Sequence, residues 1–457
     1  MSDRILADVD SVHMVGAGGA GMSGLAKLLA RSGHTVTGSD LKPGRMLDSL
    51  AEVGIETWIG HRPDRASGWD LVVASSAVPG GDPELAAARD SSVPVWERPQ
   101  LLSALTRFMP AVGFAGTHGK TTCTALMVTA LRGMGLDPSF LVGGTLVDLN
   151  TGAHLGTGDR FVLEADEAFG TFLSLSLEGL LVTNIEADHL DHYGDIESLH
   201  EAFADVASAV DGPVVVCADD PGSAGLTSPG GVVTYGFSPN ADWKVGDVVH
   251  DGWSTRFTLV DPAGRDYSVT VPKPGTHVAL DAAGVLALCG QLEIDVADAA
   301  AALAGFGGVK RRFEVRAQTA GVTVVEDYAH HPTEIAATIE AARLGSDGRV
   351  WAIFQPHRYS RTAELADEFG PALSGADRVI VTAIYPAGET PIPGVTSQLI
   401  VEAVRRSGGD ALGIGGFPEL TRRLVPELME GDLVLLLGAG DINQTAEPIA
   451  AALGGLR

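Results

Sequence analysis

The sequence is poor in cysteine, aromatic residues and positive charge. Its three cysteines, Cys123, Cys217 and Cys289, show no paired spacing, which argues against a disulfide framework and favours a reducing compartment, the cytoplasm. Lysine and arginine number 31 against 58 acidic residues, which gives a formal charge of −27. This balance offers no broad basic face to phosphates, which argues against a general nucleic-acid binder.

Long apolar runs are also missing. None approaches the roughly 20 residues that a membrane span requires, and residues 1–16 lack the basic region and apolar core of a signal peptide. We therefore expect neither a membrane partner nor export. The sequence leaves the oligomeric state open.

What is present is a regular alternation of apolar runs and Ala/Leu-rich stretches. Hydrophobic residues make up 45% and charged residues 19% of 457, which is typical of a globular enzyme with more than one core. The alternation predicts an α/β fold with parallel sheets covered on both faces. The expected strands are 12–15, 35–37, 71–74, 111–115, 161–163, 180–182, 321–327, 350–354, 379–383 and 433–437. The expected helices include 22–30, 83–89 and 123–133.

The strand–helix pattern restarts twice, after Pro110 and after Phe313. We therefore predict three domains, 1–108, 109–313 and 314–457, with boundaries good to a few residues. Within the second, residues 219–268 are polar and glycine-rich, which favours an irregular, β-rich segment.

A phosphate-binding loop is predicted where the strand 111–115 meets the helix 123–133. Gly113–Thr122 reads GFAGTHGKTT, and a glycine-rich turn before a helix points backbone N–H groups at an anion. Lys120 would reach the β- and γ-phosphates, and the Thr121 hydroxyl would bind Mg²⁺. Phe114 stands where the usual motif has its first glycine, so the loop is a shorter variant.

Acidic residues and histidines follow the next two strands. Glu164–Glu167 comes after the strand 161–163, and Thr183–His192 comes after the strand 180–182. Parallel α/β sheets bind ligands beyond the carboxyl ends of their strands. Carboxylate, imidazole and hydroxyl groups beside phosphates predict a Mg²⁺ site; the alternative is a solvated acidic loop.

Two further clusters lie in the third predicted domain. Glu326–Glu334 closes one strand and opens a helix, and Phe354–Thr362 follows the apolar run 350–353. Arg358 and Arg361 are three residues apart, so they can share a helix face and grip a carboxylate. A surface ion pair is the alternative, but the neighbouring aromatic residues and histidine favour a pocket.

The first strand is followed by Gly16–Gly21, which matches G-x-G-x-x-G, with Asp40 at the end of the second strand. Alone, this motif indicates dinucleotide binding and allows a dehydrogenase. Any diphosphate at a helix N-terminus needs similar glycines, so a UDP-linked ligand would fit equally well.

Together these motifs resemble the three-domain peptidoglycan amide-ligase family along the whole chain. The matching stretches are Gly16–Gly24, Gly38–Asp40, Ser75–Ala77, Gly116–Thr122, Glu164–Glu167, Thr183–Asp191, Arg311–Phe313, Asp327–Glu334, Phe354–Thr362, Tyr385–Pro393 and Gly438–Ile442. The resemblance implies a Rossmann-like N-terminal domain, a central P-loop ATPase-like domain with a parallel sheet, and a Rossmann-like C-terminal domain. It also implies an ATP- and Mg²⁺-dependent ligase that joins L-alanine to UDP-N-acetylmuramate through an acyl phosphate.

The resemblance assigns roles to individual residues. The UDP-sugar would contact the first glycine turn, the turn after the third expected strand, and an acid near the uridine: Gly18, Gly19, Ser75, Ser76 and Asp40. ATP would lie on Gly116, Thr117, His118, Gly119, Lys120, Thr121 and Thr122, with Arg312 and Asp327 reaching it from the third domain. Magnesium would be held by Thr121, Glu164 and His189. The amino acid would be held by Tyr328, His330, Arg358 and Arg361.

The implied catalytic set is Lys120, Glu164, His189 and His330, with either histidine able to take the proton of the attacking amine. Two places depart from the family pattern: Ala168-Phe169 stand where Ser-Asp is usual, and Val278 and Asp281 stand where asparagines are common. An ionised Asp near ATP phosphates would be repulsive, and Val offers no hydrogen bond. These departures keep two alternatives open, a related ligase with another amino acid or sugar acid and a non-catalytic nucleotide-binding regulator.

Overall fold

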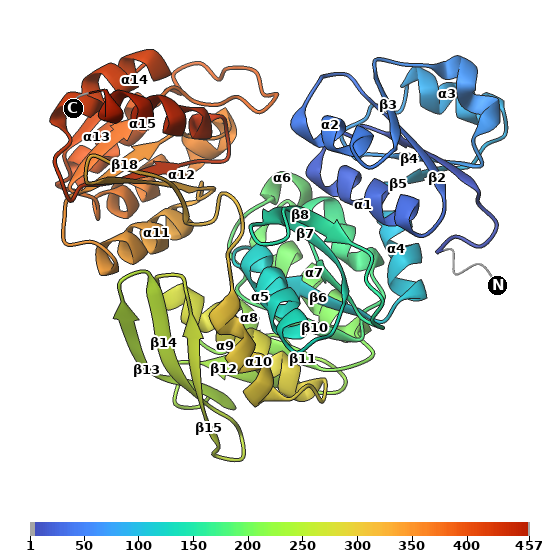
Figure 1. The fold of residues 1–457 in the computed structure, drawn as a ribbon, viewed down its shortest axis with the longest axis horizontal. Helices are drawn as coiled ribbons and strands as arrows, with labels where there is room; N and C mark the ends of the chain where they lie inside the picture. Colours follow the sequence, from blue (N-terminus) through green and yellow to red (C-terminus); the bar gives the residue numbers. More distant parts are fainter. Residues whose placement is uncertain (1–4, 456–457) are drawn as a thin grey trace. The chain divides into compact units, whose positions relative to one another are not determined.

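The structure, a computed structural model, describes residues 5–455 apart from the side chain of Asp191. The chain is an α/β protein with three sheets (Figure 1). It forms two compact units, one with the residues up to 246 plus 258–269 and 280–306, the other with 247–257, 270–279 and the residues from 307 onward. The predicted boundaries at 108 and 313 stay a prediction, and the outermost ends of the ranges 1–108 and 314–457 lie outside the described residues.

The N-terminal sheet has the strand order β3-β2-β1-β4-β5, and all its pairs are parallel. Its strands are β1 (Ser11–Val15), β2 (Thr35–Asp40), β3 (Glu56–Ile59), β4 (Leu71–Ala74) and β5 (Val95–Glu97). Its helices are α1 (Ala20–Arg31), α2 (Arg45–Ala51), α3 (Pro83–Asp90) and α4 (Arg98–Phe108), with a 3-10 turn at Pro63–Gly68. The strand order reverses between β1 and β4, and such a reversal opens a ligand crevice at the carboxyl ends of the strands.

The central sheet has ten strands in the order β15-β14-β13-β12-β11-β10-β6-β9-β7-β8. They are β6 (Ala111–Ala115), β7 (Ser139–Leu146), β8 (Thr151–His154), β9 (Phe161–Glu164), β10 (Gly179–Val182), β11 (Val214–Cys217), β12 (Val232–Gly236), β13 (Trp243–Asp251), β14 (Ser254–Val260) and β15 (Asp266–Val271). The segments between and after them form α5 (Lys120–Gly133), α6 (Leu190–Tyr193), α7 (Ile196–Ala209), α8 (Pro221–Ala224), α9 (Thr276–Gln291), α10 (Val296–Ala302) and the 3-10 turns Ala168–Ser174 and Leu303–Gly305. Strand β6 lies between β9 and β10 and is parallel to both, so the phosphate loop and the two acidic segments leave the sheet at one edge.

Residues 219–268 are more regular than predicted. Instead of an irregular segment, they contain most of the four strands β12 to β15, and β13 alone runs for 9 residues. The alternation of buried and exposed positions along β13 explains why its sequence looked polar. One face of these strands is exposed, so half of their side chains carry no apolar signal.

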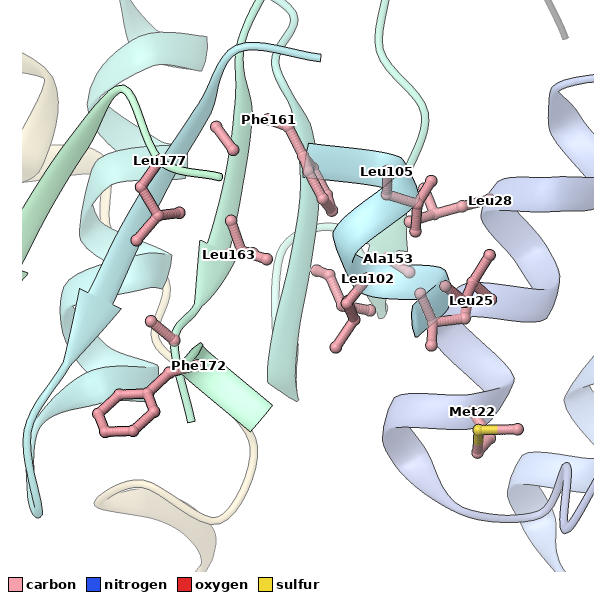
Figure 2. Packing of buried hydrophobic residues seen from close by; sticks show 14 of the residues in the cluster. Met22, Leu25, Leu28, Leu102, Leu105, Ala153, Phe161, Leu163, Phe172 and Leu177 are labelled. Atoms are coloured by element: carbon pink, nitrogen blue, oxygen red, sulfur yellow. The ribbon is translucent and has the colours of Figure 1, made fainter. Parts of the chain in front are cut away.

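α1 carries an apolar face that packs outside its own sheet. Figure 2 shows Leu25 of α1 near Leu102 of α4 and Ala153 of β8, with Met22 further along α1, and all four residues belong to one cluster of buried residues. A Cβ on Gly24 would lie 2.5 Å from Leu141 Cδ1 and 3.3 Å from Ala153 Cβ, so glycine at this position lets α1 pack closely against β7 and β8. The N-terminal and central sheets therefore share one hydrophobic core.

The C-terminal sheet has the order β16-β17-β21-β18-β19-β20. Its strands are β16 (Glu314–Thr319), β17 (Val322–Asp327), β18 (Val350–Phe354), β19 (Arg378–Val381), β20 (Ala411–Gly413) and β21 (Leu433–Leu437). Its helices are α11 (Pro332–Leu344), α12 (Tyr359–Leu373), α13 (Gln398–Arg406), α14 (Phe417–Leu424) and α15 (Ala446–Gly454), with 3-10 turns at Val425–Glu427 and Ile442–Thr445. Only the edge strand β16 is antiparallel to its neighbour. Within residues 5–455, none of the helices combines the length and apolarity that crossing a bilayer demands.

A buried polar network lies beside β1 in the N-terminal sheet. The Glu84 carboxylate, fully buried, accepts hydrogen bonds from Ser39 Oγ (2.5 Å), Trp58 Nε1 (3.0 Å) and the Arg62 backbone N–H (2.8 Å). Burial alone would raise the pKa of Glu84, but hydrogen bonds from His13, Ser39 and Arg62 outweigh it and lower the pKa to about 2.

This network predicts a pH-dependent contribution to stability. Because the folded pKa of Glu84 is below its unfolded value of 4.5, its contribution is present above pH 4.5 and is lost as the pH falls towards 2. We expect Glu84→Gln to reduce the free energy of unfolding at pH 7 by up to about 3 kcal/mol. In urea titrations the difference from the wild type should shrink as the pH falls below 4.5. A difference that does not change with pH would contradict this assignment.

Candidate active site

The phosphate loop runs between β6 and α5, and two of its glycines have backbone conformations that other residues rarely adopt. Gly116 has φ +127° and Gly119 has φ +85°. A Cβ on Gly116 would lie 2.1 Å from Thr183 Oγ1, and one on Gly119 would lie 2.8 Å from Asp281 Oδ1. The loop therefore leaves no room for side chains at these two positions, which is the form of a cradle for phosphate groups.

The end of β10 fixes the conformation of this loop. Asn184 accepts hydrogen bonds from Thr117 N–H on its carbonyl (3.0 Å) and from His118 N–H on Oδ1 (2.9 Å). Thr183 Oγ1 donates to the His118 carbonyl at 2.5 Å, and the His118 ring lies 3.5 Å from Glu186 Oε2. Asn184 and Thr183 were not among the predicted site residues, although both lie in the predicted segment 183–192.

Lys120 ends in a buried ion pair with Glu167. Its Nζ lies 2.7 and 2.8 Å from the two carboxylate oxygens of Glu167 and 2.5 Å from the Gly116 carbonyl oxygen. Burial alone would lower the pKa of Lys120, but the carboxylates of Glu167, Asp166 and Glu164 outweigh it and raise the pKa. Lys120 is therefore a firmly protonated cation on the loop.

Glu167 also contacts two residues from the segment after β10. His189 Nε2 lies 3.9 Å from Glu167 Oε1, and the Tyr193 hydroxyl donates to the Glu167 carbonyl oxygen at 2.6 Å. Burial, with Glu167 and Asp166 nearby, raises the pKa of Tyr193 to about 12. The prediction missed both Glu167 and Tyr193 as site residues. Glu167 lies in the acidic segment 164–167, and Tyr193 directly follows the segment 183–192.

Thr121 and Glu164 form a second group beside the loop. The Glu164 carboxylate accepts a hydrogen bond from the Gly143 backbone N–H at 2.6 Å and another from the Thr121 side chain. Burial raises the pKa of Glu164, although these hydrogen bonds and Lys120 oppose the shift. A hydroxyl and a carboxylate side by side at a phosphate cradle are hard oxygen donors, so the residues fit Mg²⁺. Thr122 lies half-buried in the first turn of α5.

The departures from the family pattern have distinct surroundings. Phe169 has φ +56° and is 67% exposed, with its ring edge-on to His192 at 6.1 Å between centroids. Ala168 precedes it in the same 3-10 turn. Asp281 is buried with its carboxylate against Gly119, whereas Val278 is buried in the first turn of α9.

The N-terminal glycine turn lies against Asp40 and Ser75, two of the residues that the sequence assigned to the UDP-sugar. The Gly18 N–H donates to Asp40 Oδ2 at 2.9 Å, and a Cβ on Gly16 would lie 3.0 Å from Ser75 Cβ. Gly19 is the N-cap of α1, and Ser76, next to Ser75, is exposed. The turn, the acid and the serines thus lie together at the carboxyl ends of β1, β2 and β4.

In the second unit, Arg312, which precedes β16, and the residues after β17 form a compact polar cluster. The Arg312 guanidinium lies over the Tyr328 ring at 5.3 Å and its Nη1 is 3.7 Å from Glu334 Oε1. His330 Nδ1 is 3.2 Å from Glu334 Oε2. Asp327 is buried and accepts hydrogen bonds from two backbone N–H groups, and burial raises its pKa. Glu334 was not among the predicted site residues.

The segment after β18 contributes the predicted arginines. Arg358 is the N-cap of α12 with φ +72°, and its Nε lies 2.8 Å from Glu389 Oε1. The centroid of the His357 ring lies 5.9 Å from that of the His330 ring. Burial lowers the pKa of His357 to about 4, and the positive charges of His330, Arg361 and Arg358 add to the effect. Arg361 is half-buried on α12.

Comparisons with known proteins cover nearly the whole chain. Three family models match: "Mur ligase family, catalytic domain" at residues 11–109, "Mur ligase middle domain" at 114–289 and "Mur ligase, glutamate ligase domain" at 311–440. The chain is 44% identical to UDP-N-acetylmuramate–L-alanine ligase of Sorangium cellulosum, with 97% of each chain covered. It is 42% identical to the ligase of the same name from Thermobifida fusca, with 97% of this chain and 96% of that protein covered.

Solved structures agree with the sequence relatives. The crystal structure of UDP-N-acetylmuramate–alanine ligase from Thermotoga maritima superposes with a TM-score of 0.84 at 28% identity, covering 98% of this chain and 100% of that one. A murein peptide ligase from Psychrobacter arcticus gives 0.70 at 25% identity, covering 97% and 98%. The three-domain fold and the full-length identity together show that the chain belongs to the Mur ligase family.

Proposed function

We propose that the chain is an ATP-dependent ligase that joins L-alanine to the carboxylate of UDP-N-acetylmuramate and releases ADP and phosphate. The observation that carries this proposal is the glycine cradle ending in the protonated Lys120, in a chain 44% identical over its length to a ligase of that name. The dehydrogenase alternative explains the first glycine turn but leaves this cradle without a role.

The chemistry needs no protein nucleophile. The γ-phosphate of ATP passes to the sugar carboxylate, and the amine of L-alanine attacks the acyl phosphate. The chain contributes positioning and charge, because Lys120 on the loop neutralises charge that builds up on the phosphates. Lys120 contacts Glu167 and the Gly116 carbonyl oxygen, so bound nucleotide phosphates would compete with these partners for its ammonium group.

Thr121 and Glu164, with His189 near Glu167, are the residues that we assign to Mg²⁺. The oxygens of Thr121 and Glu164 and the imidazole nitrogen of His189 lie beside the cradle, and a bound magnesium ion would supply charge neutralisation for phosphoryl transfer. We assign the remaining loop residues, from Gly116 to Thr122, to the triphosphate, and Arg312 and Asp327 to the nucleotide.

The amino-acid pocket is assigned to the cluster after β17 and β18. Arg358 and Arg361 carry the positive charge that the carboxylate of L-alanine requires, and Tyr328 and His330 line the same cluster. His357 is neutral at pH 7 because its pKa is about 4. Either His189 or His330 takes the proton of the amine.

The test is phosphate release with UDP-N-acetylmuramate, ATP and Mg²⁺, with each amino acid supplied singly. We expect the highest turnover with L-alanine and none without the sugar. Release only with a peptide or another amino acid would replace this proposal by a related ligase. Binding without turnover would replace it by a nucleotide-binding regulator.

We expect Asp281 to lower the affinity of the chain for ATP. Its buried carboxylate lies against Gly119 of the loop, where an ionised acid repels the triphosphate. We expect Asp281→Asn to lower the KM for ATP by roughly fivefold, the order expected for one charge at short range, with the KM for L-alanine unchanged. Asp205→Asn, an exposed change on α7, is the control. An unchanged or higher KM for ATP in Asp281→Asn would show that the acid does not repel the nucleotide.

A further inference from the structure

Arg98 lies beside the first turn of α1, at the carboxyl edge of the N-terminal sheet. It directly follows β5 and begins α4. A Cβ on Gly21 would lie 3.1 Å from Cζ and Nη2 of Arg98 and 3.2 Å from its Nε. The guanidinium therefore lies directly against the helix turn that follows the glycine loop, and glycine at position 21 makes room for it.

This guanidinium has no acidic partner among residues 5–455. Its Nε is buried without any hydrogen-bond partner. The neighbouring Glu97 is used elsewhere, because its carboxylate caps α4 by accepting a hydrogen bond from the third residue of that helix. In a chain with 58 acidic residues, a cation left unpaired with a buried donor points to a ligand that supplies the negative charge.

The groups around Arg98 favour an anion. The first N–H groups of a helix have no carbonyl partner within it and carry the positive end of the helix dipole, and here they belong to Ala20, Gly21 and Met22. The nearest acid on the glycine turn, Asp40, is taken up by the N–H groups of Gly18 and Lys42. The strand order also reverses at this point, between β1 and β4.

We propose that Arg98 is a further substrate-binding residue, which contacts the diphosphate of the UDP-sugar together with the first turn of α1. This inference rests on the proposed function and names a residue that neither the motifs nor the resemblance assigned. A planar guanidinium presents two parallel N–H groups to phosphate oxygens, a geometry that lysine lacks. Arg98 thus gives the acidic chain a local positive site for a doubly charged group.

Calorimetric titration of the full-length chain with UDP, and separately with uridine, tests this contact. We expect Arg98→Ala to weaken UDP binding by about 30-fold, within the range for a lost hydrogen bond to a charged group, and to leave uridine binding unchanged. Arg98→Lys should keep part of the affinity because it retains the charge. The matched control is Arg107→Ala, an exposed arginine at the other end of α4, which should bind UDP as the wild type does.

Gly21→Ala provides a second test that keeps Arg98. The new Cβ would lie 3.1 Å from Cζ and Nη2 of Arg98 and would push the guanidinium away by a few tenths of an ångström, so UDP binding should weaken while the melting temperature stays near that of the wild type. In steady-state kinetics Arg98→Ala should raise the KM for UDP-N-acetylmuramate, with the KM values for ATP and L-alanine unchanged.

Two results would overturn the inference in different ways. If the wild type binds UDP and Arg98→Ala and Gly21→Ala bind it equally well, Arg98 does not contact the diphosphate and the proposed function stands. If the wild type binds neither UDP nor UDP-N-acetylmuramate, the proposed function fails and the inference fails with it.

Discussion

Replacing Lys120 by Ala is expected to reduce ADP formation by about 10³-fold or more, the scale for losing a charged group that stabilises phosphoryl transfer. Lys120 is the protonated cation of the cradle, and no other lysine lies on the loop. Single-turnover assays with saturating UDP-N-acetylmuramate and ATP measure the effect. UDP-sugar binding, measured by calorimetry, should survive because its assigned residues lie at the N-terminal sheet.

The variant also leaves Glu167 buried without its ammonium partner, which destabilises a fold by roughly 3–5 kcal/mol when nothing else compensates. Lys120→Ala with Glu167→Gln removes the unpaired charge, so it should recover the melting temperature but not the activity. Lys244→Ala, an exposed change, is the control. Wild-type turnover in a folded Lys120→Ala chain is the result that the assignment cannot accommodate.

Replacing Arg358 by Ala is expected to raise the KM for L-alanine by about 100-fold, with a much smaller change in the KM for ATP. One contribution is the lost charged hydrogen bond to the substrate carboxylate, about 1.5–3 kcal/mol. The other contribution is repulsion by the Glu389 carboxylate, which keeps its hydrogen bonds from Ser360 after Arg358 is removed. These bonds lower the pKa of Glu389 despite its partial burial, so the ionised acid then repels the substrate.

Initial rates over a range of L-alanine and ATP concentrations separate the two KM values. Arg406→Ala, which removes an exposed guanidinium paired with Asp367 on the same sheet's helices, should leave both unchanged. If Arg358→Ala raises the KM for ATP as strongly as that for L-alanine, the amino-acid pocket is wrongly placed.

Much of the fold could be predicted because parallel strands buried on both faces are continuous apolar runs. The strands 111–115 and 350–354 were predicted with the observed bounds for this reason. The strand predicted at 379–383 ends at Val381, which pairs with Phe354, the last residue of β18. The strand predicted from Gly321 begins at Val322, because Gly321 has φ +77°.

The phosphate loop could also be predicted, since its chemistry is local in sequence. Lys120 and Thr121 follow a strand and open a helix, as the motif requires. The resemblance placed Thr121 and Glu164 together, but Glu167 as the partner of Lys120 was not predicted, because Glu164 and Glu167 belong to the same short acidic segment. Which acid faces which group depends on the turn after β9, where Thr121 meets Glu164 and Lys120 meets Glu167.

Contacts between distant segments left no signal in the sequence. Glu389 lies 31 residues beyond Arg358 yet forms an ion pair with it, and Gly21 makes room for Arg98 from another helix. The sequence marks Asp281 only as a departure from the family pattern, whereas the fold places its carboxylate against Gly119. The roles of these residues are set by tertiary packing, which neither periodicity nor motif spacing records.

The central claim is that the phosphate loop activates the sugar carboxylate by γ-phosphoryl transfer. Following an oxygen label from the carboxylate into phosphate tests this claim most directly. UDP-N-acetylmuramate labelled with ¹⁸O in its carboxylate is incubated with the chain, ATP, Mg²⁺ and L-alanine, and the released phosphate is analysed by mass spectrometry. Phosphate carrying a single ¹⁸O atom is the predicted result, because one carboxylate oxygen leaves with the phosphoryl group. Unlabelled phosphate, or label in AMP, would contradict it.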